Sequence, residues 1–201
     1  LGDEYLNQGE LDSALYYFNE SGRIFKAEQF DLGVAYNLGN VGLVYAQKGQ
    51  NTAAEENLEE AVRMLTELGD YYPICVYLTA MSDIYDARNE PGKSLEYAER
   101  SLKLAKQYGL KEQISESNLR LSNFYERSGD PQKALAFYKK HIVYRDSVSS
   151  IQDVQEMANI RTEFEVSQKQ MEVDLLNQQK VIQRYVVIGT VIMLLLIGLL
   201  A

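Results

Sequence analysis

The fold of this chain can be predicted from the stretch NVGLVYAQKGQNTAAEENLEEA, Asn40–Ala61. Apolar and small residues recur at helical spacing on both sides of Gly49, which suits a sharp turn between two helices. The first helix carries Val41 and Tyr45, and the second carries Leu58. The sequence therefore predicts a helical hairpin over this stretch.

The same hairpin recurs every 40 residues along the chain. Three sets of equivalent positions keep this spacing: the tyrosines Tyr5, Tyr45, Tyr85 and Tyr125, the turn residues Gly9, Gly49, Asn89 and Gly129, and the small residues Ala14, Ala54, Ser94 and Ala134. A repeat of this length predicts an open stack of helical hairpins in which each repeat contacts its neighbours. Such stacks usually bind other molecules rather than catalyse reactions.

Glycines and one histidine indicate where the repeats end. Gly69 and Gly109 suit the C-terminal ends of helices. We therefore expect a first repeat that lacks its N-terminal part, followed by three further repeats, with the bounds 1–30, 31–70, 71–110 and 111–147. His141 stands where earlier repeats have Ser21, Ala61 and Ser101. Its bulk would crowd a following repeat, so the array is expected to end at that hairpin.

The residue order within each unit resembles the tetratricopeptide repeat. A Leu/Val-Gly-x-x-Tyr run is followed four residues later by Gly, and then by Ala, an aromatic residue and Ala at four- and three-residue steps. The resemblance extends from Leu1 to about Tyr144. It implies an all-α superhelix of hairpins whose first helices line a concave groove.

The resemblance also implies which residues line this groove. Counted from the framework tyrosine, the family's lining positions are nine, six and two residues before it and one residue after it. The candidate partner contacts are Tyr36, Leu43, Val76, Thr79, Asp83, Asp86, Asn123 and Glu126. This lining would be apolar toward the N-terminal repeats and acidic toward the C-terminal ones. It favours a basic or neutral peptide or a neighbouring protomer, and it argues against adaptors that grip a carboxylate-ended chaperone tail.

Residues 148–184 are predicted to form a long helical stalk. The apolar residues Met157, Phe164 and Met171 are spaced by seven, and Leu175 and Ile182 form a second row with the same spacing. Such spacing is typical of a coiled-coil seam. We therefore expect a weak homodimer through a helix of roughly 55 Å, at a rise of 1.5 Å per residue.

Residues 185–201, YVVIGTVIMLLLIGLLA, carry no charge. A membrane-spanning helix needs about 20 apolar residues, and this run approaches that length where the sequence ends. We expect a single-pass transmembrane helix, and because only one flank is present the orientation is left open. The sequence starts inside a repeat and stops inside the apolar run, so we expect a piece of a longer protein.

Composition narrows the classes of function. The net charge of −9 argues against nucleic acid as a partner. Cys75 and His141 are each the only residue of their type, which excludes an intramolecular disulfide and a multi-cysteine or multi-histidine metal site. Both are expected to be packed, and the carboxylates of Glu55 and its neighbours are expected on a solvated helix face. No cofactor, metal or catalytic residue is expected in these residues.

Two functions stay open. Asp146, Ser147 and the stretch ANIRTEFEVSQKQMEVDLLNQQK before the apolar run resemble a group of membrane signalling proteins common in Bacteroidetes. That resemblance implies an extracytoplasmic (periplasmic) repeat array that relays binding to a cytoplasmic effector beyond residue 201. The effector would be a class III adenylate/guanylate cyclase, a sensor histidine kinase or a helix-turn-helix regulator. The alternative is a tail-anchored scaffold that binds partner proteins.

Overall fold

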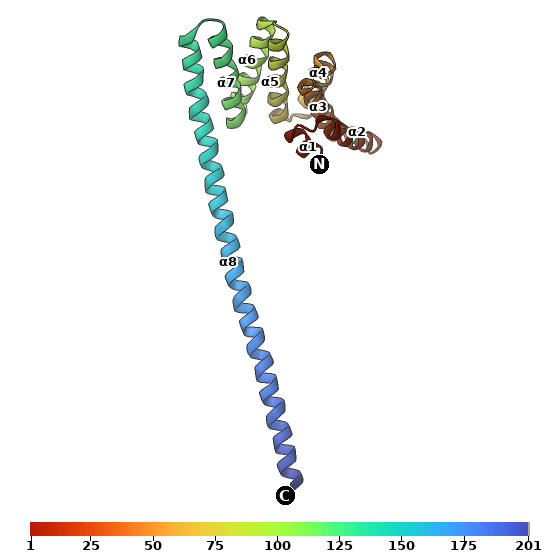
Figure 1. Cartoon of the computed structure of the whole chain (residues 1–201), viewed down its shortest axis with the longest axis vertical. Helices are drawn as coiled ribbons and strands as arrows, with labels where there is room; N and C mark the ends of the chain where they lie inside the picture. Colours follow the sequence, from red (N-terminus) through yellow and green to blue (C-terminus); the bar gives the residue numbers. More distant parts are fainter. Residues whose placement is uncertain (201) are drawn as a thin grey trace. The chain divides into compact units, whose positions relative to one another are not determined.

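The computed structural model describes the backbone of residues 1–200 and the side chains of residues 1–152, 154–163 and 165–180. This part of the chain is helical and contains no strand, which confirms the predicted all-α fold. The helices (Figure 1) are α1 (Gly2–Asn7), α2 (Leu11–Ala27), α3 (Asp31–Gln47), α4 (Asn51–Leu68), α5 (Tyr71–Ala87), α6 (Pro91–Gln107), α7 (Lys111–Arg127) and α8 (Pro131–Leu200). The chain divides into two units, Leu1–Ser149 and Ser150–Ala201.

In the first unit, neighbouring helices pair as hairpins. Helix α1 packs on α2, α3 on α4 and α5 on α6, and the helices α3, α5 and α7 also contact one another in succession. The beginning of α8 closes the last hairpin, because Ser122 Oγ on α7 donates to the carbonyl of Ala134 over 2.9 Å. The predicted stack of helical hairpins is therefore confirmed.

The turns show why certain residue types recur at fixed positions. Gly49 has a φ of 71° and Asn89 a φ of 60° in the turns of their hairpins. The left-handed region is unfavourable for residues with a β-carbon, but asparagine tolerates it better than most. Asn89 can therefore replace the glycine of the other repeats. Gln29 has a φ of 53° where later repeats place Gly69 and Gly109, and nothing in the spacing pattern indicated this exception.

Stacked aromatic rings brace three of the four hairpins. The pairs have nearly parallel rings with centroids 5.3 to 5.4 Å apart, and they are Tyr5–Tyr17, Tyr85–Tyr97 and Tyr125–Phe137. Such pairs contribute about 0.5–1.5 kcal/mol beyond their buried area. In the second hairpin the position of the partner ring holds Asn57, whose Nδ2 donates to the carbonyl of Ala53 over 2.8 Å.

The second hairpin relies instead on close approach of the backbone. A β-carbon added at Gly42 would lie 2.7 Å from Cγ of Leu58, and one added at Gly39 would overlap the ring of Tyr77. Leu58 and Tyr77 are buried in the largest apolar cluster, which α3, α4 and α5 build together. Glycine on α3 therefore lets α4 and α5 pack against its backbone.

The second unit is the continuation of α8, a helix of 70 residues in all. Met157, Met171 and Leu175 of the predicted seam are exposed there, whereas Phe164 and Ile182 lie outside the residues with described side chains. Among the described residues, no helix is both long enough and apolar enough to cross a membrane. The predicted span, residues 185–201, lies outside the described side chains.

Candidate functional site

Two adjoining hollows form a groove along α3, α5 and α7. The first hollow, between α3 and α5, has a volume of about 310 Å³, and its lining includes Leu43, Ala46, Ala80, Asp83, Ile84 and Ala87. The second, between α5 and α7, has a volume of about 300 Å³, and its lining includes Ser82, Asp83, Asp86, Arg120, Asn123, Glu126 and Arg127. Because Asp83 lines both hollows, they are two halves of one groove.

The first half of the groove is mostly apolar. Ala80, Ile84 and Ala87 recur at helical spacing, so α5 presents them on one side together with Asp83. Leu43 supplies the large apolar surface from α3, and the small side chains of Ala46 and Ala80 leave the hollow open. This half suits an apolar side chain of a ligand.

The second half of the groove holds paired charges. Arg120 Nε lies 2.8 Å from Asp83 Oδ1, and Arg127 forms an ion pair with Asp86. With Glu126, three carboxylates face two guanidinium groups. The predicted acidic lining is thus largely neutralised by α7. Exposed ion pairs of this kind contribute little to stability, about 0–1 kcal/mol, so a charged ligand can exchange with them at small cost.

Asp83 has the most unusual environment of the groove carboxylates. Its side chain keeps 52% of its surface open to solvent, yet three helices surround it. Desolvation raises the pKa of Asp83 above its ordinary value, and Arg120 opposes this shift. A ligand that covers Asp83 would displace the water that now reaches it, and a hydrogen bond to its carboxylate would then be strengthened.

The structure brings together five of the eight predicted contacts, namely Leu43, Asp83, Asp86, Asn123 and Glu126. The other three lie outside the two hollows. Tyr36 donates its hydroxyl to Asp70 Oδ2 over 2.7 Å, and burial together with this bond raises the pKa of Tyr36 to about 12. Val76 packs against the central apolar cluster.

Thr79 is buried between α5 and α6, away from the groove. Its Oγ1 donates to the carbonyl of Cys75 over 2.9 Å and lies 3.2 Å from Ser101 Oγ. Ser117 Oγ of α7 donates to the same Ser101 oxygen over 2.9 Å. Because these hydroxyl side chains are small, the helices pack closely here and bury Thr79. A rule that counts positions from the framework tyrosine does not predict this burial.

The sequence pattern did not predict the side-chain hydrogen bonds and ion pairs between repeats. Glu55 was expected on a solvated face, and that prediction is wrong: its carboxylate accepts from Arg88 Nη1 over 2.5 Å and from the Tyr85 hydroxyl. Tyr72 donates to Glu112 over 2.7 Å. The two partners of each of these bonds are at least 30 residues apart in the sequence, so local periodicity carries no signal for them.

Cys75 and His141 are buried, which confirms the prediction that both are packed. Burial raises the pKa of the Cys75 thiol to about 11. His141 Nδ1 lies 2.9 Å from Ser115 Oγ, and this contact joins α8 to α7 at the end of the array. Among the described side chains, no cluster of three or more His, Cys, Asp or Glu residues could hold a metal ion.

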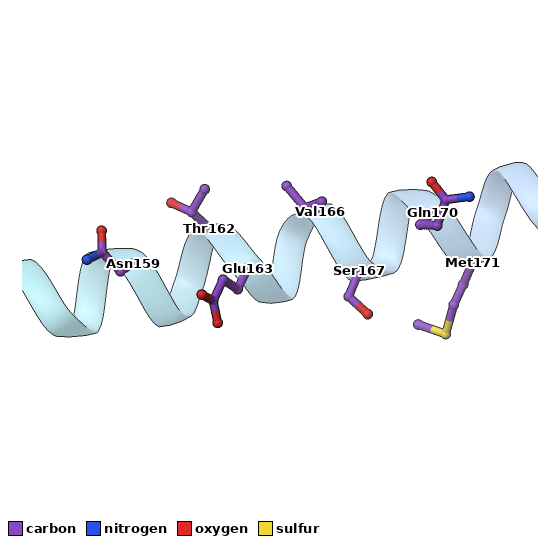
Figure 2. Close-up of a pocket in the computed structure, with 7 residues that line it drawn as sticks. All are labelled: Asn159, Thr162, Glu163, Val166, Ser167, Gln170 and Met171. Atoms are coloured by element: carbon purple, nitrogen blue, oxygen red, sulfur yellow. The ribbon is translucent and has the colours of Figure 1, made fainter. Parts of the chain in front are cut away.

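A further hollow lies along α8 in the second unit. Figure 2 shows its lining in two rows along one helix, with Asn159, Thr162, Val166 and Gln170 on one edge and Glu163, Ser167 and Met171 on the other. Every lining residue belongs to α8. It is therefore a stripe on the surface of a single helix, and the groove is the better candidate site.

Comparison with known proteins defines the class of this fold. Two family models, each described as a tetratricopeptide repeat, match residues 31–107 and residues 119–147. These parts of the chain are therefore tetratricopeptide repeats.

A curated protein is similar to this chain at low sequence identity. The chain is 25% identical over 142 residues to response regulator aspartate phosphatase A of Bacillus subtilis (strain 168), a match that takes in 71% of this chain and 36% of that protein. The chain thus spans about a third of the length of this curated relative.

Two solved structures share the fold. BtubC (BKLC) from P. vanneervenii superposes with a TM-score of 0.63 at 19% identity, over 74% of this chain and 62% of that one. The apo form of RapI superposes with a TM-score of 0.54 at 14% identity, over 74% of this chain and 67% of that one.

Proposed function

We propose that the repeat array binds a peptide segment of a partner protein in the groove along α3, α5 and α7. The observation that carries this proposal is the pair of hollows that share Asp83, one apolar and one polar. An apolar side chain of the ligand would fill the space beside Leu43 and Ala80. A basic side chain next to it would reach Asp83 and Glu126, where carboxylates outnumber guanidinium groups.

A binding titration tests this proposal. The probes are two fluorescein-labelled peptides that alternate leucine with lysine or leucine with glutamate, and the readout is fluorescence anisotropy with the full chain in mild detergent. We expect the lysine peptide to bind more tightly. Asp83→Asn combined with Glu126→Gln should weaken its binding about tenfold, because two carboxylates facing the ligand are lost.

Two further variants make the test specific. Ala87→Leu fills the apolar hollow at an exposed position and should also weaken binding. Glu96→Gln removes a carboxylate from the exposed surface of α6, outside the groove, and should leave the affinity unchanged. If the lysine peptide binds all four proteins equally, the groove is not the binding site.

We further propose that the array is the sensor region of a membrane-anchored signalling protein. The uncharged run at 185–201 supports a single membrane span, with the array on the periplasmic side and an effector beyond residue 201. The resemblance of the stalk sequence favours a class III adenylate/guanylate cyclase or a sensor histidine kinase as that effector. Ligand binding would then reach the effector through α8.

The stalk is proposed to act as a homodimer. Met157, Met171 and Leu175 expose apolar surface at coiled-coil spacing. Sedimentation of the full chain in detergent should therefore show a concentration-dependent dimer, and Met157→Glu with Met171→Glu should abolish it. Val166→Glu is the matched control, because Val166 is exposed and lies about two and a half turns from Met157, on the opposite side of the helix. Loss of the dimer in this control as well, or a monomer throughout, would contradict the proposal.

The alternative function is a tail-anchored scaffold that binds signalling proteins. The similarity to response regulator aspartate phosphatase A favours a signalling protein as the partner of such a scaffold. A reading frame that continues far beyond residue 201 supports the sensor, and a stop codon within a few residues supports the scaffold.

A further inference from the structure

A separate hollow lies outside the groove. It lies where α6 meets the start of α8 and has a volume of about 650 Å³. Its lining includes Leu102, Lys103, Lys106, Leu121, Phe137 and Lys140. We call it the lysine hollow. It belongs entirely to the first unit.

The lysine hollow has an apolar floor and a cationic rim. Leu121 and Leu102 are buried, and Phe137 is partly buried beside them. The ammonium group of Lys140 lies 5.0 Å from the centre of the Phe137 ring. A ligand that contacts both parts must present carboxylates or other anions next to an apolar group.

The repeat architecture supplies an internal comparison. Forty residues earlier in the sequence, a hollow of about 390 Å³ is lined by the equivalent residues Glu59, Val62, Arg63, Thr66, Tyr97 and Arg100. There, Arg63 is held by Glu60 at 2.6 Å and by Glu67 at 2.8 Å. In the earlier hollow, two ion pairs therefore neutralise Arg63.

The lysine hollow lacks this internal neutralisation. The equivalents of Glu60 and Glu67 are Arg100 and Gln107, so the two carboxylates that hold Arg63 have no counterpart beside Lys103. Lys106 replaces the neutral Thr66. Glu99 is the one acidic residue in the lining. Within the part of the chain whose side chains are described, none of the ion pairs includes Lys103, Lys106 or Lys140.

The charge of the array changes sign along the sequence. Residues 1–70 contain thirteen acidic and four basic residues, whereas residues 91–149 contain seven acidic and eleven basic residues. The net charge of −9 for the whole chain hides this difference. The basic end attracts acidic partners from a distance, and the hollow adds the apolar contact that fixes them.

We propose that the lysine hollow is a second docking site, which binds an acidic amphipathic segment of a partner protein. Carboxylates of that segment would pair with Lys103, Lys106 and Lys140, and an apolar side chain would rest on Leu102 and Phe137. A helix whose apolar residues lie beside its carboxylates fits between two helices in this way. Phosphate-rich nucleic acid would leave the apolar floor unused.

The experiment uses two short fluorescein-labelled helical peptides, one of glutamate, leucine and alanine and the other with glutamine in place of glutamate. Anisotropy with the full chain in mild detergent should show binding of the glutamate peptide alone, weakening as salt rises. Lys103→Glu with Lys106→Glu should reduce its affinity at least about tenfold, because attraction becomes repulsion. The control, Lys93→Glu with Lys133→Glu, makes the same charge change on α6 and α8 outside the hollow and should have little effect.

A second experiment transfers the charges of the lysine hollow to the earlier hollow. Glu60→Arg, Thr66→Lys and Glu67→Gln give the earlier hollow the charges of the later one and should raise the stoichiometry to two peptides per chain. Circular dichroism of every variant checks that the helices are retained. The proposal is overturned if both peptides bind equally, or if the control loses as much affinity as the test variant. It is also overturned if phosphatidylserine vesicles or single-stranded RNA bind through these lysines while the glutamate peptide does not, or if the chain associates with itself through them.

Discussion

Replacing Gly39 with leucine is expected to lower the free energy of unfolding by at least about 3 kcal/mol. Even a single β-carbon at this position would overlap the ring of Tyr77, a residue that is only 2% exposed. The contacts of α5 with α3 and α4 join the second hairpin to the third. Urea unfolding followed by circular dichroism should therefore shift to lower denaturant and separate into two transitions.

The next contact along the array suggests how to rescue this variant. There, Thr79 and Ser117 take the places of Gly39 and Tyr77, and both bond to Ser101. Gly39→Thr alone should be strongly destabilising, and adding Tyr77→Ser should recover part of the loss. If Gly39→Leu unfolds at the same urea concentration as the unmodified chain, the packing of α5 against α3 is not as described.

Replacing Leu58 with alanine is expected to cost about 2–5 kcal/mol. Leu58 is fully buried on α4 and packs directly beneath Gly42 of α3, so its loss leaves a cavity that the glycine cannot fill. In a repeat array, stability is approximately a sum of local terms and contacts between neighbours. Hydrogen exchange should therefore speed up most in α3 and α4, and less in α7.

Two controls accompany this variant. Leu58→Met keeps the volume and should cost less than about 1.5 kcal/mol. Leu135→Ala removes the same group from an exposed position on α8 and should change stability by no more than about 0.5 kcal/mol. Equal losses at Leu58 and Leu135 would mean that α4 does not bury its apolar face against α3.

The hairpins could be predicted because each follows from short-range spacing. Gly49 sets the turn, and Tyr45 and Leu58 lie within a few turns of it on either side. The four copies of the hairpin carry the same types of residue at equivalent positions. The substitution of Asn89 for a turn glycine was also predictable, since asparagine adopts the left-handed conformation that the structure shows there.

The chemistry of the groove depends on partners that the repeat pattern does not link. Asp83 and Asp86 were expected to make the lining acidic, but their partners Arg120 and Arg127 come from the neighbouring helix. The lysine hollow is a similar case, because it appears only when α6 and α8 lie side by side. Spacing predicts which residues share a helix face, and it does not predict which faces meet or how their charges balance.

The buried thiol of Cys75 can report local opening of the array. It is the only cysteine in the sequence, it is fully buried on α5, and its pKa of about 11 leaves it almost entirely protonated near neutral pH. An alkylating reagent can therefore reach it only when α5 separates from the helices that cover it, α6 and α7. The rate of labelling measures how often the middle of the array opens, with no engineered probe, and its change on adding a peptide would show whether ligands hold that part of the array closed.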